Sequence, residues 1–178
     1  SLSGGSPSWV DPTGFTLIDT SPGTSFAGIS TYRKTADGTE TGFTTTSTGG
    51  TVQTSIVELA GLGTPTVATG ENSNAGATSL AAASSAPSAV GSSGIALAFW
   101  VAANTMGATA SPPDGGFSEF RTASQQTLQR RAAKPITAPG AVNSTYGWAT
   151  SRPAASQMLL LETGTESDFL PQAIRYVG

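Results

Sequence analysis

Few side chains in this sequence could do chemistry, and two residue types that most often do so are missing. The chain of 178 residues contains no histidine and no cysteine. Histidine is the commonest general base near neutral pH, and a cysteine thiolate is a nucleophile and a zinc ligand. Their absence excludes the Ser-His-Asp mechanism, histidine-ligated zinc, disulfides and thiolate chemistry. The remaining candidates are carboxylates, basic residues and aromatic rings.

Two glutamates, Glu58 and Glu162, stand at matching ends of two apolar segments. A pair of carboxylates about 5–10 Å apart can cleave a glycosidic bond. Acids at the ends of strands can also be solvated, or can bind the backbone amides of turns. We favour this second interpretation and predict no catalytic residue, so the chain is not expected to be an enzyme.

Two aspartates, Asp37 and Asp114, each precede a glycine. Carboxylate oxygens are ligands for Ca²⁺, but a calcium site needs several of them and the chain has no D-x-D-x-D spacing. The Asp-Gly pair is itself a signature of a tight turn, because glycine tolerates a positive φ. We therefore predict turns at both places, with no metal site and no cofactor.

Three aromatic residues, Trp9, Tyr146 and Trp148, lie in or near turn-rich segments. Exposed rings stack on sugar rings, so these three are the candidate glycan-binding residues. The alternative is that they close the ends of a β-sandwich, since large aromatic residues tend to be buried. Trp100 stands in the middle of an apolar run and is predicted to belong to the core.

The only adjacent basic pairs are Arg33-Lys34 and Arg130-Arg131, and the net charge is −3. Successive residues of a strand point to opposite faces, so neither pair makes a basic stripe. The sequence therefore predicts no nucleic-acid binding. The two pairs are expected to lie on a solvated face, or to pair with acids or with a neighbouring subunit.

No segment predicts insertion into a membrane. The longest apolar run, residues 95–103, is shorter than the roughly 20 residues that span a bilayer. The chain also does not open with the basic and apolar regions of a signal peptide. These observations leave open a cytoplasmic protein, a processed protein, or a particle protein released by lysis.

Short segments rich in β-branched and aromatic residues, separated by turn residues, dominate the chain. The predicted strands are residues 15–20, 26–34, 42–48, 51–59, 94–103, 117–123, 126–133, 144–150 and 154–163. Residues 70–89 are rich in Ser, Ala and Asn and are predicted as a long surface excursion. That excursion would hold one strand at residues 78–82, or a helix at residues 79–86 that lacks an amphipathic stripe.

The chain also repeats a pattern about 100 residues apart. Residues 11–18 and 112–119 both run from a Pro-containing turn through Gly and Phe into a strand-like segment. Many short strands without a convincing helix indicate an all-β sandwich or jelly roll, here built from two similar halves. We assign residues 1–164 to this domain and residues 165–178 to an extended C-terminal docking tail. Its opening strand is expected upstream of Ser1 or from another chain.

Residues 12–18, 29–34 and 56–61, with Glu40 before a Thr-rich strand, resemble a recurring β-sandwich module of bacteriophage tail-associated and other virion surface proteins. The resemblance covers roughly residues 9–163 and includes no catalytic residues. It implies a structural or adhesion component of a phage-like particle, such as a tail, head-spike or decoration domain. Its partners would be other virion subunits in a homo-oligomer on the particle surface, and a host surface polysaccharide. The alternative is a carbohydrate-binding module of a secreted protein.

Overall fold

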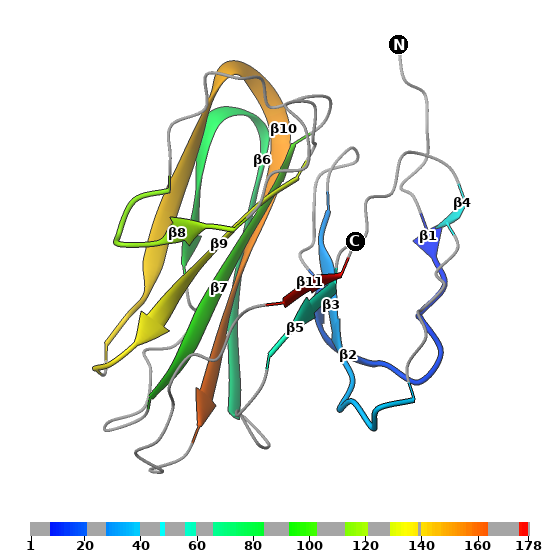
Figure 1. Cartoon of the computed structure of the whole chain (residues 1–178). Helices are drawn as coiled ribbons and strands as arrows, with labels where there is room; N and C mark the ends of the chain where they lie inside the picture. Colours follow the sequence, from blue (N-terminus) through cyan, green and yellow to red (C-terminus); the bar gives the residue numbers. More distant parts are fainter. Residues whose placement is uncertain are drawn as a thin grey trace.

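The computed structural model describes residues 8–20, 28–39, 47–48, 56–59, 66–83, 93–102, 113–120, 129–138, 140–163 and 175–177. All of the regular structure in these ranges is β, which confirms the predicted all-β sandwich (Figure 1). The strands are β1 (Ser8–Trp9), β2 (Thr16–Thr20), β3 (Ser30–Arg33), β4 (Ser47–Thr48), β5 (Ile56–Glu58), β6 (Thr66–Ala83), β7 (Ser93–Ala102), β8 (Ser118–Glu119), β9 (Gln129–Ile136), β10 (Asn143–Thr163) and β11 (Arg175–Val177).

A five-stranded antiparallel sheet with the order β6-β10-β7-β9-β8 is the centre of the molecule. Its middle strand β7 alternates as the sequence predicts, because successive side chains point to opposite faces. Ala96, Ala98 and Trp100 enter one buried cluster, whereas Leu97 and Phe99 enter another. The sheet is thus covered on both faces, and Trp100 is a core residue as predicted.

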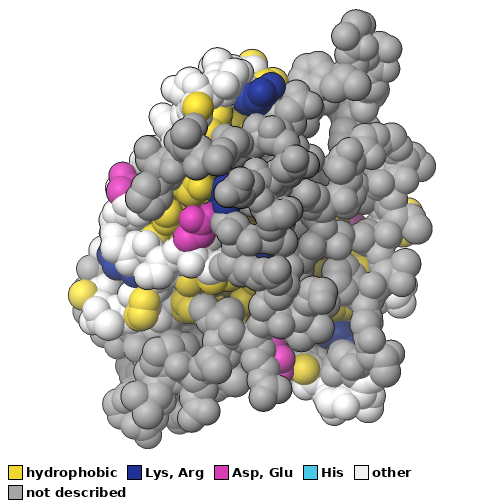
Figure 2. Space-filling model, turned by 45° about the horizontal axis from the view of Figure 1, so that its top comes forward, with side chains coloured by type: hydrophobic (Ala, Val, Ile, Leu, Met, Phe, Trp, Pro, Cys, Tyr) yellow, Lys and Arg dark blue, Asp and Glu magenta, His cyan; other side chains and the backbone are white. Residues whose placement is uncertain are grey.

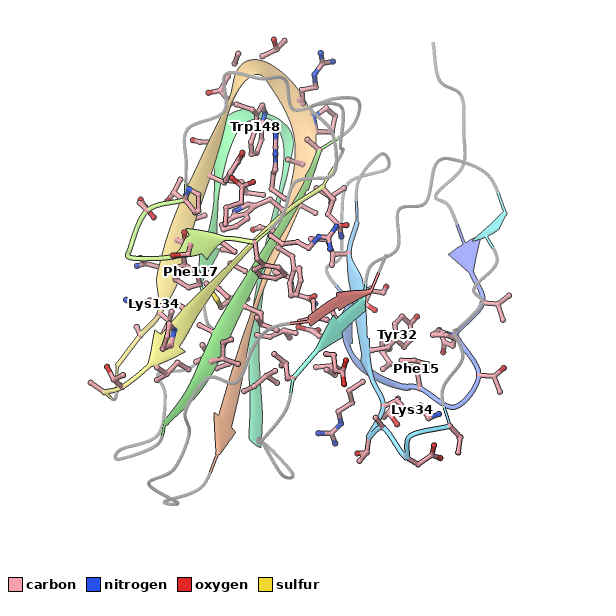
Figure 3. All side chains as sticks on the ribbon, in the orientation of Figure 1. Phe15, Tyr32, Lys34, Phe117, Lys134 and Trp148 are labelled. Atoms are coloured by element: carbon pink, nitrogen blue, oxygen red, sulfur yellow. The ribbon has the colours of Figure 1, made fainter. Side chains whose placement is uncertain are left out.

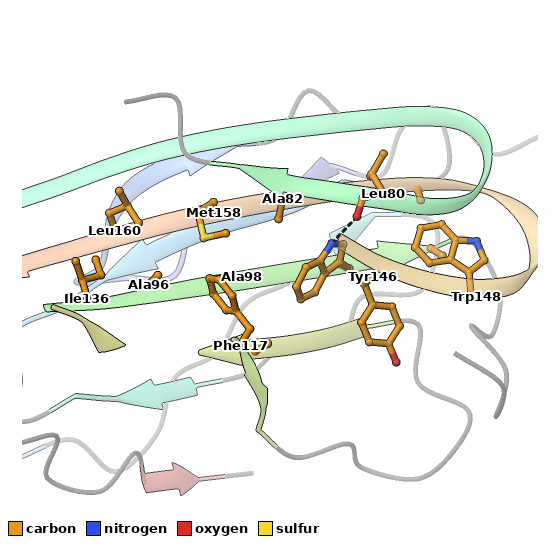
Figure 4. Packing of buried hydrophobic residues seen from close by; sticks show 14 residues of the cluster. Leu80, Ala82, Ala96, Ala98, Phe117, Ile136, Tyr146, Trp148, Met158 and Leu160 are labelled. Atoms are coloured by element: carbon orange, nitrogen blue, oxygen red, sulfur yellow. Dashed lines mark hydrogen bonds between the residues drawn. The ribbon is translucent and has the colours of Figure 1, made fainter. Parts of the chain in front are cut away.

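The first face is covered by the sheet's own longest strands. β6 and β10 pair along most of their length, and the ribbon that they form bends so that its far end returns over β7 (Figure 4). The backbone oxygen of Leu80 on the returning arm accepts a hydrogen bond from Trp100 Nε1 at 3.0 Å, and that of Ala81 accepts one from Ser156 Oγ at 2.7 Å. We call the β6–β10 pair the folded ribbon.

The folded ribbon bends where its ladder is interrupted. The register shifts between Gly147 and Arg152, and again between Arg152 and Ala154, so residues of β10 are left without a partner on β6. Such bulges bend a strand and increase its twist. Pro153 stands inside the second shift, where its missing N–H removes no ladder hydrogen bond. The two strands predicted at residues 144–150 and 154–163 are therefore two arms of one bent strand.

The strand predicted at residues 78–82 is confirmed, but it is only the end of β6, which runs from Thr66 to Ala83 where a long excursion was expected. Leu80 and Ala82 of this strand are buried in the core. Its Ser, Ala and Asn residues have weak β propensity, but pairing with β10 supplies backbone partners regardless of side chain. Tertiary context thus overrides propensity here, and the helix considered at residues 79–86 is absent from residues 79–83.

The second face of the sheet is covered by residues from the first third of the chain (Figure 1). Here the strands form three two-stranded antiparallel sheets, β1–β4, β2–β3 and β5–β11. Ile29 is buried against the sheet, and Ile18 and Leu59 pack partly buried beside it. We call strands β1–β5 together with β11 the N-terminal layer. Pairing of β11 with β5 places the end of the chain on this layer.

Candidate functional site

A charged cluster forms where β8 meets β9, at the edge of the five-stranded sheet. Glu119 of β8 and Arg130 of β9 approach with an N–O distance of 3.4 Å. The Arg130 guanidinium also lies over the Tyr146 ring of the returning arm, 5.9 Å from its centroid. Arg130 is only 8% exposed, whereas the Glu119 side chain is 26% exposed. A buried charge needs a partner of opposite charge, and the Glu119 carboxylate supplies one for the buried Arg130 guanidinium. The same carboxylate is still partly exposed to solvent.

The phenol of Tyr146 responds to this environment. Its pKa is raised from the ordinary value of 10.0, first because burial penalises the phenolate and second because the Glu119 carboxylate repels it. The Arg130 guanidinium acts in the opposite direction. Tyr146 thus stays a neutral hydrogen-bonding phenol. Within this cluster the Glu119 carboxylate is the group that reaches solvent, and it could accept a hydrogen bond from a hydroxyl-bearing ligand.

A second polar contact lies between the layers. Gln157 is fully buried on the face of the sheet that the N-terminal layer covers, and its Oε1 accepts a hydrogen bond from Thr31 Oγ1 of β3. The Nε2 of Gln157 and the Oε1 of Gln129 are buried with no hydrogen-bond partner among the described residues. Buried polar atoms are normally paired, so this interface departs from a purely apolar one.

The loop before β8 is held by one aspartate. Asp114 Oδ1 accepts a hydrogen bond from the Thr145 backbone N at 2.6 Å, and Asp114 O accepts one from Ser144 Oγ at 3.0 Å. Lys134 Nζ donates to the carbonyl oxygen of Gly115 at 2.8 Å. These contacts attach the loop to β9 and β10.

The predicted turn role of both aspartates is confirmed. Gly115, after Asp114, has φ 69°, and Gly38, after Asp37, has φ 85°. Asp37 Oδ1 also accepts hydrogen bonds from the backbone N and Oγ1 of Thr39. Within the described residues, no group of three or more acidic, histidine or cysteine side chains could hold a metal ion.

The three candidate glycan-binding residues are not brought together as an exposed set. Tyr146 is 2% and Trp148 4% exposed, and both belong to the first-face core. The Tyr146 ring lies 5.4 Å from that of Trp100, and Trp148 Nε1 donates to the Ala77 carbonyl oxygen. Neither ring offers a face to a sugar in this structure. The side chain of Trp9 lies outside the described part, so its role stays a prediction.

The solvated face expected for the two basic pairs is found at only one of them. Arg33 and Lys34 are exposed, but Arg130 and Arg131 are 8% and 6% exposed, so that prediction is wrong for the second pair. The reason is that β9 lies between β7 and β8, and the Arg130 contact with Glu119 matches the alternative of pairing with an acid. On the face shown in Figure 2, the described basic and acidic side chains are interspersed.

The two glutamates considered as a catalytic pair lie in different sheets. Glu58 is exposed on β5 opposite Arg175 of β11, and Glu162 belongs to β10. Sequence reasoning did not single out Glu119, Gln157 or Thr31. A signal was available at Gln157, a polar residue between the apolar Ala155 and Leu159 on the same face of β10.

The described part of the chain contains no helix with the length and apolar character needed to span a bilayer.

In comparisons with known proteins, the chain matches no protein-family model, no curated protein and no solved structure.

Proposed function

We propose that the chain is a structural or adhesion component of a phage-like particle, a tail, head-spike or decoration domain that assembles with other subunits. The observation that carries the proposal is how its polar side chains are used. Asp37 and Asp114 hold turns, Thr31 and Gln157 join two layers, and Arg130 pairs with Glu119 inside the fold. These polar side chains stabilise the fold, and a stable fold is what a structural component of a particle requires.

The sequence supports the same proposal. The resemblance to virion β-sandwich modules supplies the particle context, and charged residues make up only 11% of the chain. Ordinary globular domains carry about a quarter of charged residues. A chain with so few charged side chains is compatible with dense packing of copies beside one another.

The test is to find the chain on particles. Antibodies raised against the purified chain would be applied to particles from the source culture and viewed by immunogold electron microscopy, with particle-free culture fluid as the control. We expect gold at regular positions on head or tail, and the chain at constant stoichiometry in density-purified particles. Absence of the chain from such particles, with the protein recovered only in the fluid, would overturn the proposal.

Contact with a surface glycan is the adhesive part of the proposal, and the charged cluster favours it over the buried rings. The Glu119 side chain is 26% exposed, and a carboxylate at the surface can hydrogen-bond sugar hydroxyls, whereas Arg130 and Tyr146 lie buried beside it. A glycan array comparing wild type with Glu119→Gln, and with Asp37→Asn as matched control, tests it. We expect a bound polysaccharide to be lost only in Glu119→Gln. Binding of plant or storage polysaccharides instead would favour a carbohydrate-binding module of a secreted protein.

A further inference from the structure

We propose that the second face of the five-stranded sheet is an exchange surface that takes the β2–β3 hairpin of a second copy of this chain when copies are crowded. The inference rests on the proposed function, because crowding of identical copies is what a particle surface provides. It names the partner, a second copy, and the element by which that partner joins.

The backbone ladders divide the molecule into two parts. All five strands of the central sheet come from one continuous stretch, residues 66–163. Strands β1–β5 pair only with one another or with β11, and no ladder in the described structure joins them to the central sheet. The N-terminal layer is therefore attached through side chains, without the strand pairing that would make exchange slow.

The central sheet also has a core of its own. Within the described residues, the first-face cluster is built from residues 77–160, with Trp100, Met158 and Leu160 fully buried in it. No described residue of the N-terminal layer belongs to this cluster. Removing the hairpin would therefore uncover the second face while the first-face core stays packed.

The contacts that hold the hairpin are few and specific. Ile29 is buried on the second face, Ile18 packs beside it, and Thr31 donates to Gln157. Among the described residues of the first third of the chain, Ile29 is the buried member of the second-face cluster, and Ile18 and Leu59 are only partly buried. The face therefore recognises an element with an apolar residue and a hydroxyl two positions apart on one strand, which is what a second copy carries.

The same interface contains a penalty that keeps docking reversible. The Nε2 of Gln157, whose Oε1 accepts from Thr31, is buried and has no hydrogen-bond partner within the described part of the chain. A buried polar atom left unpaired opposes burial, whereas detachment of the hairpin returns it to water. The layer is thus held by a weaker interface than the folded ribbon, whose Leu80 and Ala81 carbonyl oxygens accept hydrogen bonds from the Trp100 and Ser156 side chains.

Crowding decides between the hairpin of the same chain and that of a neighbour. A tethered element has an effective concentration on the order of millimolar, so dilute copies keep their own hairpin. Where identical copies approach that local concentration, exchange creates a dimer without any new type of contact. The exchanged and closed forms share the Ile29 and Thr31 contacts, which is why the balance follows concentration.

The absence of cysteine from the 178 residues allows a test by site-specific cross-linking. Thr31→Cys is prepared with a heavy isotope label and Gln157→Cys without one, and the two are unfolded and refolded together. A short bis-maleimide then reports covalent heavy–light dimers by mass spectrometry. Each chain carries one cysteine, so a product forms only when the hairpin of one copy lies on the sheet of another. Thr16→Cys, exposed on β2, replaces Thr31→Cys as matched control.

We expect heavy–light dimers that increase with protein concentration for the Thr31→Cys and Gln157→Cys mixture, and background only for the control mixture. The Thr31→Cys/Gln157→Cys double variant should close within one chain when dilute. Closure of the double variant without any mixed dimer would overturn exchange, and failure of the double variant to close would overturn the docking on which exchange depends.

Unmodified protein gives a second measurement that needs no folding of variants. Sedimentation after refolding should show a dimer whose share grows with concentration and falls again on dilution, and a monomer at every concentration would overturn the inference. The two proposals fail separately. Particles that carry the chain without mixed dimers would remove exchange alone, whereas particles that lack the chain would remove the proposed function whatever the cross-linking shows.

Discussion

The two copies of the repeated turn-and-strand pattern meet different surroundings. In the first, the Phe15 N–H donates to Pro12 O at 3.1 Å, and β2 pairs with β3. In the second, the Phe117 N–H donates to Asp114 O at 3.3 Å, and β8 pairs with β9. The local pattern is the same, with a Gly-containing turn, a phenylalanine and an antiparallel pair of strands. Figure 3 shows the two sites on opposite sides of the molecule.

What differs is how each pair joins the rest. β9 also pairs with β7, so the second pair belongs to the five-stranded sheet, and Phe117 is buried in the first-face core. The pair β2–β3 stands as a sheet of its own, and Phe15 is only partly buried. The comparison shows that the same sequence pattern can form part of the buried core in one place and part of the N-terminal layer in another. Four predictions follow from that difference, in order of decreasing effect.

The largest effect is expected in the core that the second copy helps to build. Trp100 is fully buried and its Nε1 donates to Leu80 O, so Trp100→Ala removes a large ring and leaves that carbonyl without its donor. We expect a loss of about 3–5 kcal/mol in the free energy of unfolding, measured by urea denaturation with circular dichroism. Leu17→Ala, at a residue 46% exposed on β2, should cost under about 1 kcal/mol. Equal losses would contradict the division into core and N-terminal layer.

The two turns can be compared directly by the same substitution. Gly14 and Gly115 have φ 81° and 69°, a region that other residues adopt only with strain. A Cβ added at Gly115 would lie 2.7 Å from the backbone oxygen of Asn143. A Cβ added at Gly14 would have no heavy atom of the described residues within 4 Å. Thermal unfolding should show a loss of about 1 kcal/mol for Gly14→Ala and about 2–3 kcal/mol for Gly115→Ala. The reverse order would show that the second turn is not packed as described.

The contact between the N-terminal layer and the central sheet should contribute less to the free energy of unfolding. In a double-mutant cycle of Thr31→Val and Gln157→Met, we expect a coupling of about 1 kcal/mol in the free energy of unfolding. Hydrogen exchange should accelerate in β3 and not in β7, because only the N-terminal layer loosens. Thr16→Val, exposed on the neighbouring strand, should change stability by less than about 0.5 kcal/mol. Additive losses in the cycle would show that the two side chains are not coupled.

The smallest effect concerns pH and the charged cluster. Because the pKa of Tyr146 is raised in the folded chain, the unfolded chain loses this proton first as pH rises above 10.0. The unfolded state then binds fewer protons, so stability is fully present below that pH and falls as pH rises through the folded-state pKa. Denaturation at about pH 9 and about pH 11 should show a smaller decline for Tyr146→Phe than for wild type. An equal decline would place its cause elsewhere.

The parts of the fold that depend on neighbouring residues were predictable. The alternation of Ile95, Leu97 and Phe99 against Ala96 and Ala98 predicts a strand buried on both faces, and the structure agrees. The Asp37-Gly38 turn was likewise readable. In each case the conformation follows from side-chain sterics and periodicity over a few residues.

The parts of the fold that depend on residues far apart in the sequence could not be predicted. Residues 70–83 carry weak strand signals and became β6 only because β10 pairs with them. Arg130 and Arg131 resemble surface residues until β8 and β7 enclose their strand. The charged cluster needs Glu119, Arg130 and Tyr146 from three strands, and no spacing in the sequence indicates that they meet.

By itself, the sequence determined the all-β class, the Asp-Gly turns, the two-faced strand β7 and the exclusion of histidine and cysteine chemistry. Only the tertiary structure decided that the folded ribbon covers one face of the sheet, that the N-terminal layer covers the other, and that Gln157 lies between them. The physical reason is the distance along the sequence over which each interaction acts. Turns and alternation arise from backbone sterics within a few residues, whereas the layering arises from burial of apolar faces among strands far apart in the chain.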